Sequence, residues 1–299
     1  MNIVVSGASG LIGSELVTAL QSAGHTVTRL VRRSAGPGEV FWNPDTETID
    51  TAALAAAAPD AVIHLAGAGI GDKRWSAAYK LQVLESRTKG TRVIAKAISE
   101  LPKKPRVFLS GSAIGFYGPR GDEVVDESSA SGTGFLADVC KEWEASAKPA
   151  IDAGIRTVFL RTGIVLSRKG GALKKQLPIF KLGLGGKMGK GNQWQSWISI
   201  ADEVGAIIHL LTADVHGPVN LTSPGAVTQA EFAKSLGRAV KRPAIAPVPS
   251  FAPKLLLGSE MADALLFTGQ RVAPNALLAS GYGFRHSSLD QALRDILAK

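Results

Sequence analysis

The chain has a single cysteine, Cys140, among 299 residues. One thiol excludes an intramolecular disulfide, and no Cys–His spacing typical of zinc sites is present. Long apolar runs are also missing: the longest stretch, residues 52–70, is interrupted by Pro59, Asp60 and His64 and cannot span a membrane. Because the sequence begins directly with a strand, we expect no signal peptide, no membrane association and a cytoplasmic location.

Acidic residues are in the minority, since 25 Asp and Glu face 34 Lys and Arg, for a formal charge of +9. No nucleic-acid-binding motif accompanies this excess, so we expect no nucleic-acid partner. A basic balance favours anionic small molecules, although solvated surface lysines explain each local group equally well. With 45% hydrophobic and 20% charged residues the chain can build a sizeable core. We expect a globular monomer or homodimer that acts on a small-molecule substrate.

What the sequence does contain is a glycine-rich turn near its N-terminus. The apolar residues 2–6 run into a G-x-x-G-x-x-G segment, and a helical pattern follows to about residue 24. Glycines let the backbone turn tightly and approach a pyrophosphate, while the free N–H groups of the helix start attract the anion. We expect Gly7 to make the turn, Gly10 the close approach and Gly13 the helix-on-strand packing. The predicted dinucleotide contacts in this turn are Gly7, Ser9, Gly10, Leu11, Ile12 and Gly13.

The strand at residues 26–31 follows an apolar helix of the right length, which favours a nucleotide site over an ordinary strand-to-helix turn. NAD-binding members of such folds carry an acid about twenty residues beyond the glycines, whereas an Arg accommodates the 2′-phosphate of NADP. This chain has no acid there and carries Arg29, Arg32 and Arg33. Guanidinium groups bind phosphate bidentately. We predict NADP as the cofactor, with Arg32 and Arg33 favoured as contacts; Arg29 is equally well interpreted as a solvated charge.

Strands and helices alternate through the first half, a pattern typical of a doubly wound α/β sheet. Ligands of such sheets bind beyond the carboxyl ends of the strands, where we expect Leu65, Ala66, Gly67 and Ser110 to contact the cofactor. The predicted architecture is a Rossmann parallel sheet over residues 1–165, rejoined by about 197–222, with a smaller C-terminal α/β substrate domain over 166–299. The predicted strands are 26–31, 40–42, 61–65, 106–110 and 157–161, and the helices 52–58, 77–100 and 135–153.

Several short motifs resemble landmarks of one enzyme superfamily. They are the glycine turn, His64-Leu65-Ala66-Gly67, Ser110-Gly111-Ser112-Ala113 with Tyr117-Gly118, Leu160-Arg161-Thr162-Gly163, and residues 197–204. Together they resemble the extended short-chain dehydrogenases/reductases of the nucleotide-sugar epimerase/dehydratase group. Ser86-Arg87-Thr88, residues 135–140 and residues 269–274 are more similar to bacterial epimerase-family proteins of the predicted nucleotide-sugar epimerase type. The resemblance covers essentially the whole chain and implies NADP(H) chemistry on a polar carbonyl or sugar-type molecule.

The catalytic pair of that superfamily is missing. Its members carry Tyr-x-x-x-Lys in the helix after the serine motif, where the tyrosine exchanges a proton with the reacting oxygen and the lysine lowers its pKa. Here Phe-Leu-Ala-Asp-Val-Cys, residues 135–140, takes that place. Ser112 resembles the serine that polarises the carbonyl, and Tyr117 offers a phenol in the same loop, so we predict these two as catalytic residues. A turn-forming serine is an equally good interpretation of Ser112, and we expect His64 and Cys140 to be packed in the core.

The C-terminal half contains less specific signals. Glycines alternate with lysines over residues 168–192, which suits either a diphosphate group or a solvated loop. We interpret Asp202 and Glu203 as N-terminal helix charges favoured by the dipole. Residues 254–267 are amphipathic and are expected to pack on the nucleotide domain or on a second subunit. Two functions stay open: an NADP(H)-dependent oxidoreductase or epimerase, and a catalytically inactive NADP(H)-binding regulatory or assembly protein.

Overall fold

The computed structural model describes residues 1–298 and has at its centre an eight-stranded sheet of order β12-β8-β6-β5-β1-β2-β3-β4. Every neighbouring pair is parallel except β3 with β4. The chain moves from β1 first to one edge and then to the other, so the predicted doubly wound sheet is confirmed. Its strands are β1 (Asn2–Ser6), β2 (Thr26–Val31), β3 (Glu39–Asn43), β4 (Thr48–Ile49), β5 (Ala61–His64), β6 (Val107–Ala113), β8 (Arg156–Thr162) and β12 (Gly217–Leu221).

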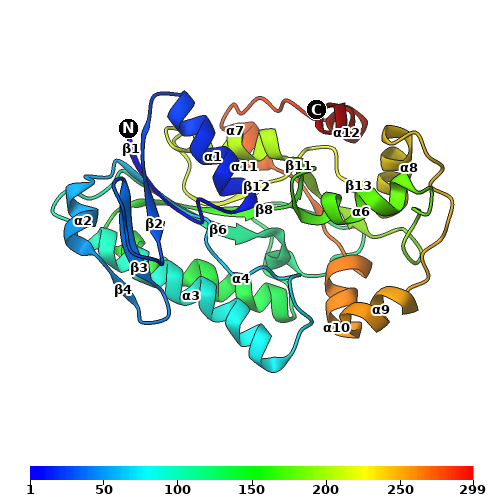
Figure 1. Cartoon of the computed structure of the whole chain (residues 1–299), viewed down its shortest axis with the longest axis horizontal. Helices are drawn as coiled ribbons and strands as arrows, with labels where there is room; N and C mark the ends of the chain where they lie inside the picture. The colour runs from blue at the N-terminus through cyan, green and yellow to red at the C-terminus, as the bar shows by residue number, and fades with distance from the viewer. Residues whose placement is uncertain (299) are drawn as a thin grey trace.

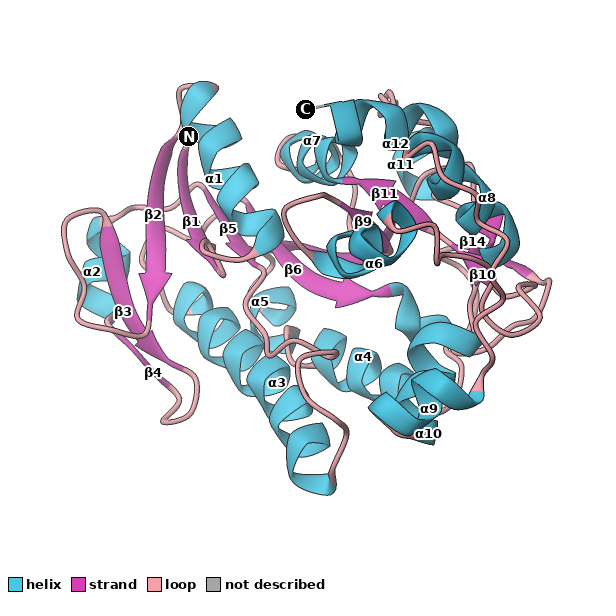
Figure 2. Ribbon diagram, turned by 45° about the vertical axis from the view of Figure 1, so that its right-hand side comes forward, coloured by secondary structure: helices cyan, strands magenta, loops and turns pink. Residues whose placement is uncertain are grey.

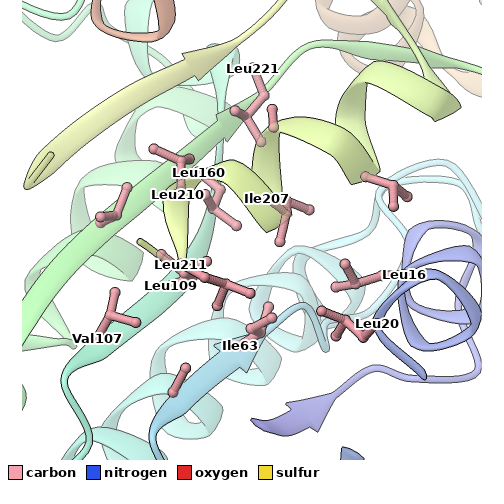
Figure 3. Close-up of a cluster of buried hydrophobic side chains, with 14 of the residues drawn as sticks. Leu16, Leu20, Ile63, Val107, Leu109, Leu160, Ile207, Leu210, Leu211 and Leu221 are labelled. Carbon is pink, nitrogen blue, oxygen red and sulfur yellow. The ribbon is translucent and has the colours of Figure 1, made fainter. Parts of the chain in front are cut away.

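Helices cover both faces of this sheet (Figure 2). On one face, α1 and α7 place Leu16, Leu20 and Ile207 against Ile63 and neighbouring strand residues (Figure 3). The other face is covered by α2, α3 and α5 through a second buried apolar cluster. These helices and their neighbours are α1 (Leu11–Ser22), α2 (Thr51–Ala56), α3 (Ala77–Ser99), α4 (Phe135–Ala145), α5 (Lys148–Asp152), α7 (Ile200–Leu210) and α11 (Asn275–Ala279).

A smaller C-terminal part lies beside the sheet and has an apolar cluster of its own, which includes Leu173, Trp197 and Leu236 (Figure 1). Within residues 1–298 no helix is both long and apolar enough to cross a membrane. The remaining elements are β7 (Val124–Val125), β9 (Ile164–Leu166), β10 (Trp194–Gln195), β11 (Trp197–Ser199), β13 (Val227–Thr228), β14 (Arg271–Val272), α6 (Gly171–Lys181), α8 (Gln229–Ala239), α9 (Phe251–Leu257), α10 (Ser259–Ala262), α12 (Leu289–Ala298), the 3₁₀ turn η1 (Ile114–Tyr117) and the π-helical turn η2 (Asp263–Phe267).

The helix predicted over residues 135–153 is wrong in one respect, because two helices stand there. α4 ends at Ala145, and α5 begins at Lys148 with Pro149 in its first turn. Proline fits only the first turn of a helix, since its ring removes the N–H and clashes with the preceding turn. The other predicted helices and strands of the first half end within three residues of their expected limits.

Asp202 and Glu203 lie in the first turn of α7, as predicted, and both are buried. Ser199 caps α7 by accepting the Asp202 N–H at 3.0 Å, and its hydroxyl donates to Asp202 Oδ2 at 2.8 Å. The same carboxylate accepts the backbone N–H groups of Arg285 at 2.7 Å and His286 at 3.0 Å. Asp202 therefore joins residues 285 and 286 to the start of α7 by hydrogen bonds.

Candidate nucleotide-binding and active site

The glycine turn has the tight packing that its sequence predicted. Gly7 has a φ of 70°, and a Cβ there would lie 2.7 Å from the Leu65 carbonyl carbon. A Cβ on Gly13 would overlap the Gly7 carbonyl oxygen. Gly10 donates its N–H to that same oxygen at 2.9 Å. The glycine turn therefore packs directly against the start of α1 and against the residues after β5, with no room for side chains between them. We call this surface of main-chain atoms, formed around Gly7, Gly10 and Gly13, the cradle.

The first turn of α1 suits a phosphate. It contains no acidic residue, and no side chain caps its N–H groups, so these donors and the helix dipole are available to an anion. A loop from the C-terminal part lies over this end: Leu11 contacts the position of Gly170, and Lys169 pairs with Glu15 of α1. Residues 169 and 170 therefore border the same site as the glycine turn.

The predicted phosphate-binding arginines are not equivalent. Arg33 forms two hydrogen bonds to Glu39, at 2.6 and 2.7 Å, and lowers the pKa of that carboxyl to about 2. Arg29 pairs in register with Glu39 on β3. Arg32 is exposed, and no residue in the range 1–298 accepts a hydrogen bond from its side chain. Sequence reasoning missed Glu39, since only the β2–β3 register brings this acid to the arginines.

The loop after β5 also borders the cradle, but the predicted contacts differ in their access to it. The backbone of Leu65 and Ala66 packs against Gly7. Gly67 lies beside the Arg87 side chain, with its Cβ position 3.4 Å from Arg87 Cζ. Ser110 lies within β6 and is fully buried. Its side chain therefore does not face solvent.

Ser112 takes part in a buried ionic network. Its hydroxyl donates to Glu144 Oε1 at 2.7 Å. The Glu144 carboxylate is also held bidentately by Arg161, whose Nε and Nη2 lie 2.8 and 2.9 Å from its two oxygens. Because Arg161 satisfies Glu144 by itself, the serine hydroxyl can turn to another acceptor without leaving the carboxylate unpaired.

Tyr117 is fully buried. Its hydroxyl donates to Asn220 Oδ1 at 2.7 Å and accepts from Arg161 Nη1 at 3.0 Å. Burial raises the pKa of the phenol above its ordinary value. A proton-donating role for Tyr117 would require this network to open, so its position argues for a structural role.

The two positions of the missing catalytic pair are filled by apolar or neutral groups. Gly115 packs against Leu136, with its Cβ position 3.3 Å from the leucine Cβ, and Cys140 Sγ lies 3.6 Å from the Ala113 carbonyl oxygen. Burial raises the pKa of the Cys140 thiol to about 12 and lowers the pKa of His64 to about 3. Both side chains are packed in the core as predicted, and neither is charged at neutral pH.

A model of the NAD dependent epimerase/dehydratase family matches residues 3–222. The chain belongs to this family. It is similar to an epimerase family protein of Mycobacterium bovis, 44% identical over 293 residues that cover 97% of this chain and 96% of the relative. Human SDR39U1, also named an epimerase family protein, is 38% identical over 302 residues and the match covers 100% of both chains. The resemblance to extended short-chain dehydrogenases/reductases is confirmed.

The fold agrees with this assignment. The crystal structure of human epimerase family protein SDR39U1 (isoform 2) with NADPH matches with a TM-score of 0.91 at 36% identity, covering 100% of this chain and 99% of that one. A UDP-glucuronic acid 4-epimerase from Bacillus cereus with NAD matches at 17% identity and a TM-score of 0.77, which is a likeness of fold. Residues 248–296 match a domain of unknown function.

In this member of the epimerase/dehydratase family, side chains from both parts of the chain surround the start of α4. Lys80 forms an ion pair with Glu260 of α10 and lies 4.6 Å from the centre of the Phe135 ring. Phe135 packs edge-on against Trp75. The amphipathic segment 254–267 therefore contacts the nucleotide-binding part. This is one of the two predicted alternatives, the other being a second subunit.

One buried acid lies at the end of β8. Thr162 Oγ1 donates to Glu203 Oε1 at 2.9 Å, while Oε2 is buried without a partner in the described chain. Burial raises the pKa of Glu203 to about 8, so the group is mostly a neutral carboxylic acid at pH 7.

Proposed function

We propose that this protein binds NADP(H) and acts as an oxidoreductase or epimerase on the carbonyl group of a polar small molecule. The observation that carries the proposal is the cradle of Gly7, Gly10 and Gly13, where added side chains would meet backbone, next to uncapped N–H groups of α1. That combination suits a pyrophosphate. The NADPH in the human SDR39U1 crystal structure supports the same cofactor here.

NADP(H) fits better than NAD(H) because the exposed Arg32 has no partner and can take the 2′-phosphate. Glu39 holds Arg33 by both of its terminal nitrogens, which orients that guanidinium and leaves its Nε–H available. The carboxylate of Glu39 is thus neutralised by arginine instead of being offered to a ribose hydroxyl. A cytoplasmic location, where NADPH is the usual reductant, is part of the proposal.

The bound cofactor would supply or accept a hydride at the nicotinamide ring. Ser112 is our proposed hydrogen-bond donor to the carbonyl oxygen, since Arg161 keeps Glu144 satisfied when the serine turns. No phenol–lysine relay assists it, because Leu136 and Cys140 stand where the superfamily has that pair. The proton would come from a different group or from water.

The second candidate is a nucleotide-binding regulatory or assembly protein without turnover. It is favoured by the same two residues, Leu136 and Cys140, and by the buried positions of Ser112 and Tyr117. Both candidate functions include NADP(H) binding, but only the first includes turnover of a substrate.

Two measurements separate them. Calorimetric titration with NADPH and NADH tests the cofactor, and we expect NADPH to bind at least about tenfold tighter, a difference of roughly 1.4 kcal/mol. A spectrophotometric screen of NADPH oxidation across aldehydes, ketones, oxo acids and sugar nucleotides tests turnover. Tight NADPH binding with no oxidation of any compound would favour the regulatory protein, and no NADPH binding would refute both.

A further inference from the structure

Arg87 of α3 lies at the place where the active site lacks its usual cation. Its guanidinium carbon is 4.9 Å from the centre of the Trp143 ring and 3.4 Å from the Cβ position of Gly67. It is close enough to Cys140 for the two groups to influence each other's pKa. By the resemblance to the superfamily, Cys140 stands near the position of the motif's lysine. A positive charge therefore stands beside that position, supplied by another helix.

The hydrogen bonds of Arg87 use only one edge of its guanidinium. Nη1 donates to the carbonyl oxygens of Ala68 at 2.9 Å and Val83 at 3.0 Å. Within residues 1–298, Nε and Nη2 have no hydrogen-bond acceptor, and no carboxylate forms an ion pair with Arg87. The N–H groups of Nε and Nη2 point the same way from one edge, a spacing that matches the two oxygens of a carboxylate.

This leaves a partly buried positive charge without an ion-pair partner among residues 1–298. Partly buried charges in proteins are normally paired, because desolvation is costly. Charges of both signs lie in the neighbouring loop: Lys175 donates to the Gly71 carbonyl at 3.2 Å, and the Asp72 carboxylate lies against Gly69. Lys80 is paired with Glu260. An anion is therefore favoured by the free donors of Arg87 itself.

We propose that the free edge of Arg87 binds a carboxylate of the substrate, which makes the preferred substrate an oxo acid. This inference rests on the proposed oxidoreductase function. In the reduction, a hydride leaves NADPH for the carbonyl carbon, the C=O π electrons move to the oxygen, and a water molecule protonates that oxygen and leaves as hydroxide, which gives a hydroxy acid and NADP⁺. Arg87 keeps its protons throughout and holds the acid group next to the reacting carbonyl.

The test compares acids with their uncharged counterparts. NADPH oxidation is measured with a panel of 2-oxo and 3-oxo acids, each beside its methyl ester, for the wild type and Arg87→Gln. We expect the wild type to prefer an acid over its ester by about 100-fold in kcat/KM, and Arg87→Gln to remove that preference by losing the acid activity only. Arg87→Lys keeps the positive charge but cannot donate two parallel hydrogen bonds, so it should retain part of the preference for the acid over its ester.

Arg92→Gln is the matched control, since Arg92 is an exposed arginine on the same helix, and it should keep the preference. Binding of oxamate, an unreactive analogue of a 2-oxo acid, to the complex with NADPH gives a second readout: calorimetry should detect it in the wild type and not in Arg87→Gln. NADPH affinity should change less than about twofold in all variants.

Three results would overturn the inference. The first is equal use of acids and esters by the wild type, and the second is loss of NADPH affinity in Arg87→Gln with the acid preference intact, which would assign the fork to the cofactor ribose. The third is a wild type that turns over no acid and binds no oxamate. A wild type that does not bind NADPH at all is a separate outcome: it rejects the proposed function, and the inference with it.

Discussion

The ends of β1 and β6 lie in the same sheet but are built in opposite ways. At the end of β1, backbone meets backbone: Gly7, Gly10 and Gly13 leave no room for side chains, and no side chain caps the first turn of α1. At the end of β6, side chains satisfy each other, since Ser112 and Arg161 both bind Glu144. The first region offers free backbone donors to a ligand, whereas in the second Ser112, Glu144 and Arg161 bind one another.

This difference teaches where the chain has kept the features of its superfamily. A backbone cradle depends on the absence of side chains, so few substitutions preserve it. The catalytic end depends on individual side chains, and the segment 135–140, where the resemblance puts the pair, contains neither tyrosine nor lysine. Near that end, Arg87 is partly buried, carries a charge, and keeps its Nε and Nη2 donors free of partners within residues 1–298.

The largest effect is expected at the glycine turn. Gly10→Val places a side chain in the path of the pyrophosphate and should lower NADPH affinity by more than about 10³-fold. A Cβ there lies 3.2 Å from the Gly7 oxygen, so the fold should tolerate it. Calorimetry and circular dichroism check the two statements. Gly283→Ala, where a Cβ meets nothing within 4 Å, is the control; normal binding by Gly10→Val would place the cofactor elsewhere.

The catalytic end is tested by a pair of hydroxyl deletions. Ser112→Ala should lower turnover by about 10²-fold with NADPH affinity unchanged, the usual size for a polarising group. Tyr117→Phe should leave turnover within about twofold and cost about 1–3 kcal/mol of stability, because Asn220 and Arg161 lose a buried partner. Steady-state rates and denaturant melts measure both. If Tyr117→Phe were inactive yet stable, the phenol would be the proton donor.

A smaller effect on NADPH affinity is expected when Arg32, which has no described partner, is compared with Arg33, which is paired with Glu39. Arg32→Ala should weaken NADPH about tenfold or more and leave NADH affinity unchanged, since only the 2′-phosphate is lost as a contact. Arg33→Ala should have a weaker effect because Glu39 already engages that side chain. Titration of both variants with both nucleotides decides the matter, and an unchanged NADPH preference in Arg32→Ala would rule this residue out as its source.

The smallest effect concerns Glu203. Burial raises its pKa to about 8 from the ordinary 4.5, so the carboxyl ionises first in the unfolded chain and stability falls as pH rises between these values. Glu203→Gln cannot ionise and should gain melting temperature over the wild type on going from pH 5 to pH 8, by about 2–4 °C for each kcal/mol. Glu142→Gln, at an exposed site on α4, should show no such gain; an equal gain there would refute the assignment.

The sequence predicted the parallel sheet and the glycine turn because both depend on local patterns: apolar runs, glycine spacing and helix length. It could not predict which polar groups meet. Glu39 joins the arginines only through strand register, and Asp202 is buried only because residues 285 and 286 return to it. Arg87 was visible as part of a motif, but its free donors follow from the places of Ala68 and Val83.

Residues 285 and 286, near the end of the chain, bind Asp202 at the start of α7, and this has a consequence for synthesis on the ribosome. β12 supplies an edge of the central sheet at residues 217–221, and α11, Arg285 and His286 close over the face that carries α7. Because these contacts join residues far apart in sequence, the nucleotide-binding part cannot complete its packing until nearly all of the chain has emerged. A nascent chain that ends before residue 285 lacks the two backbone N–H groups that Asp202 accepts in the folded protein.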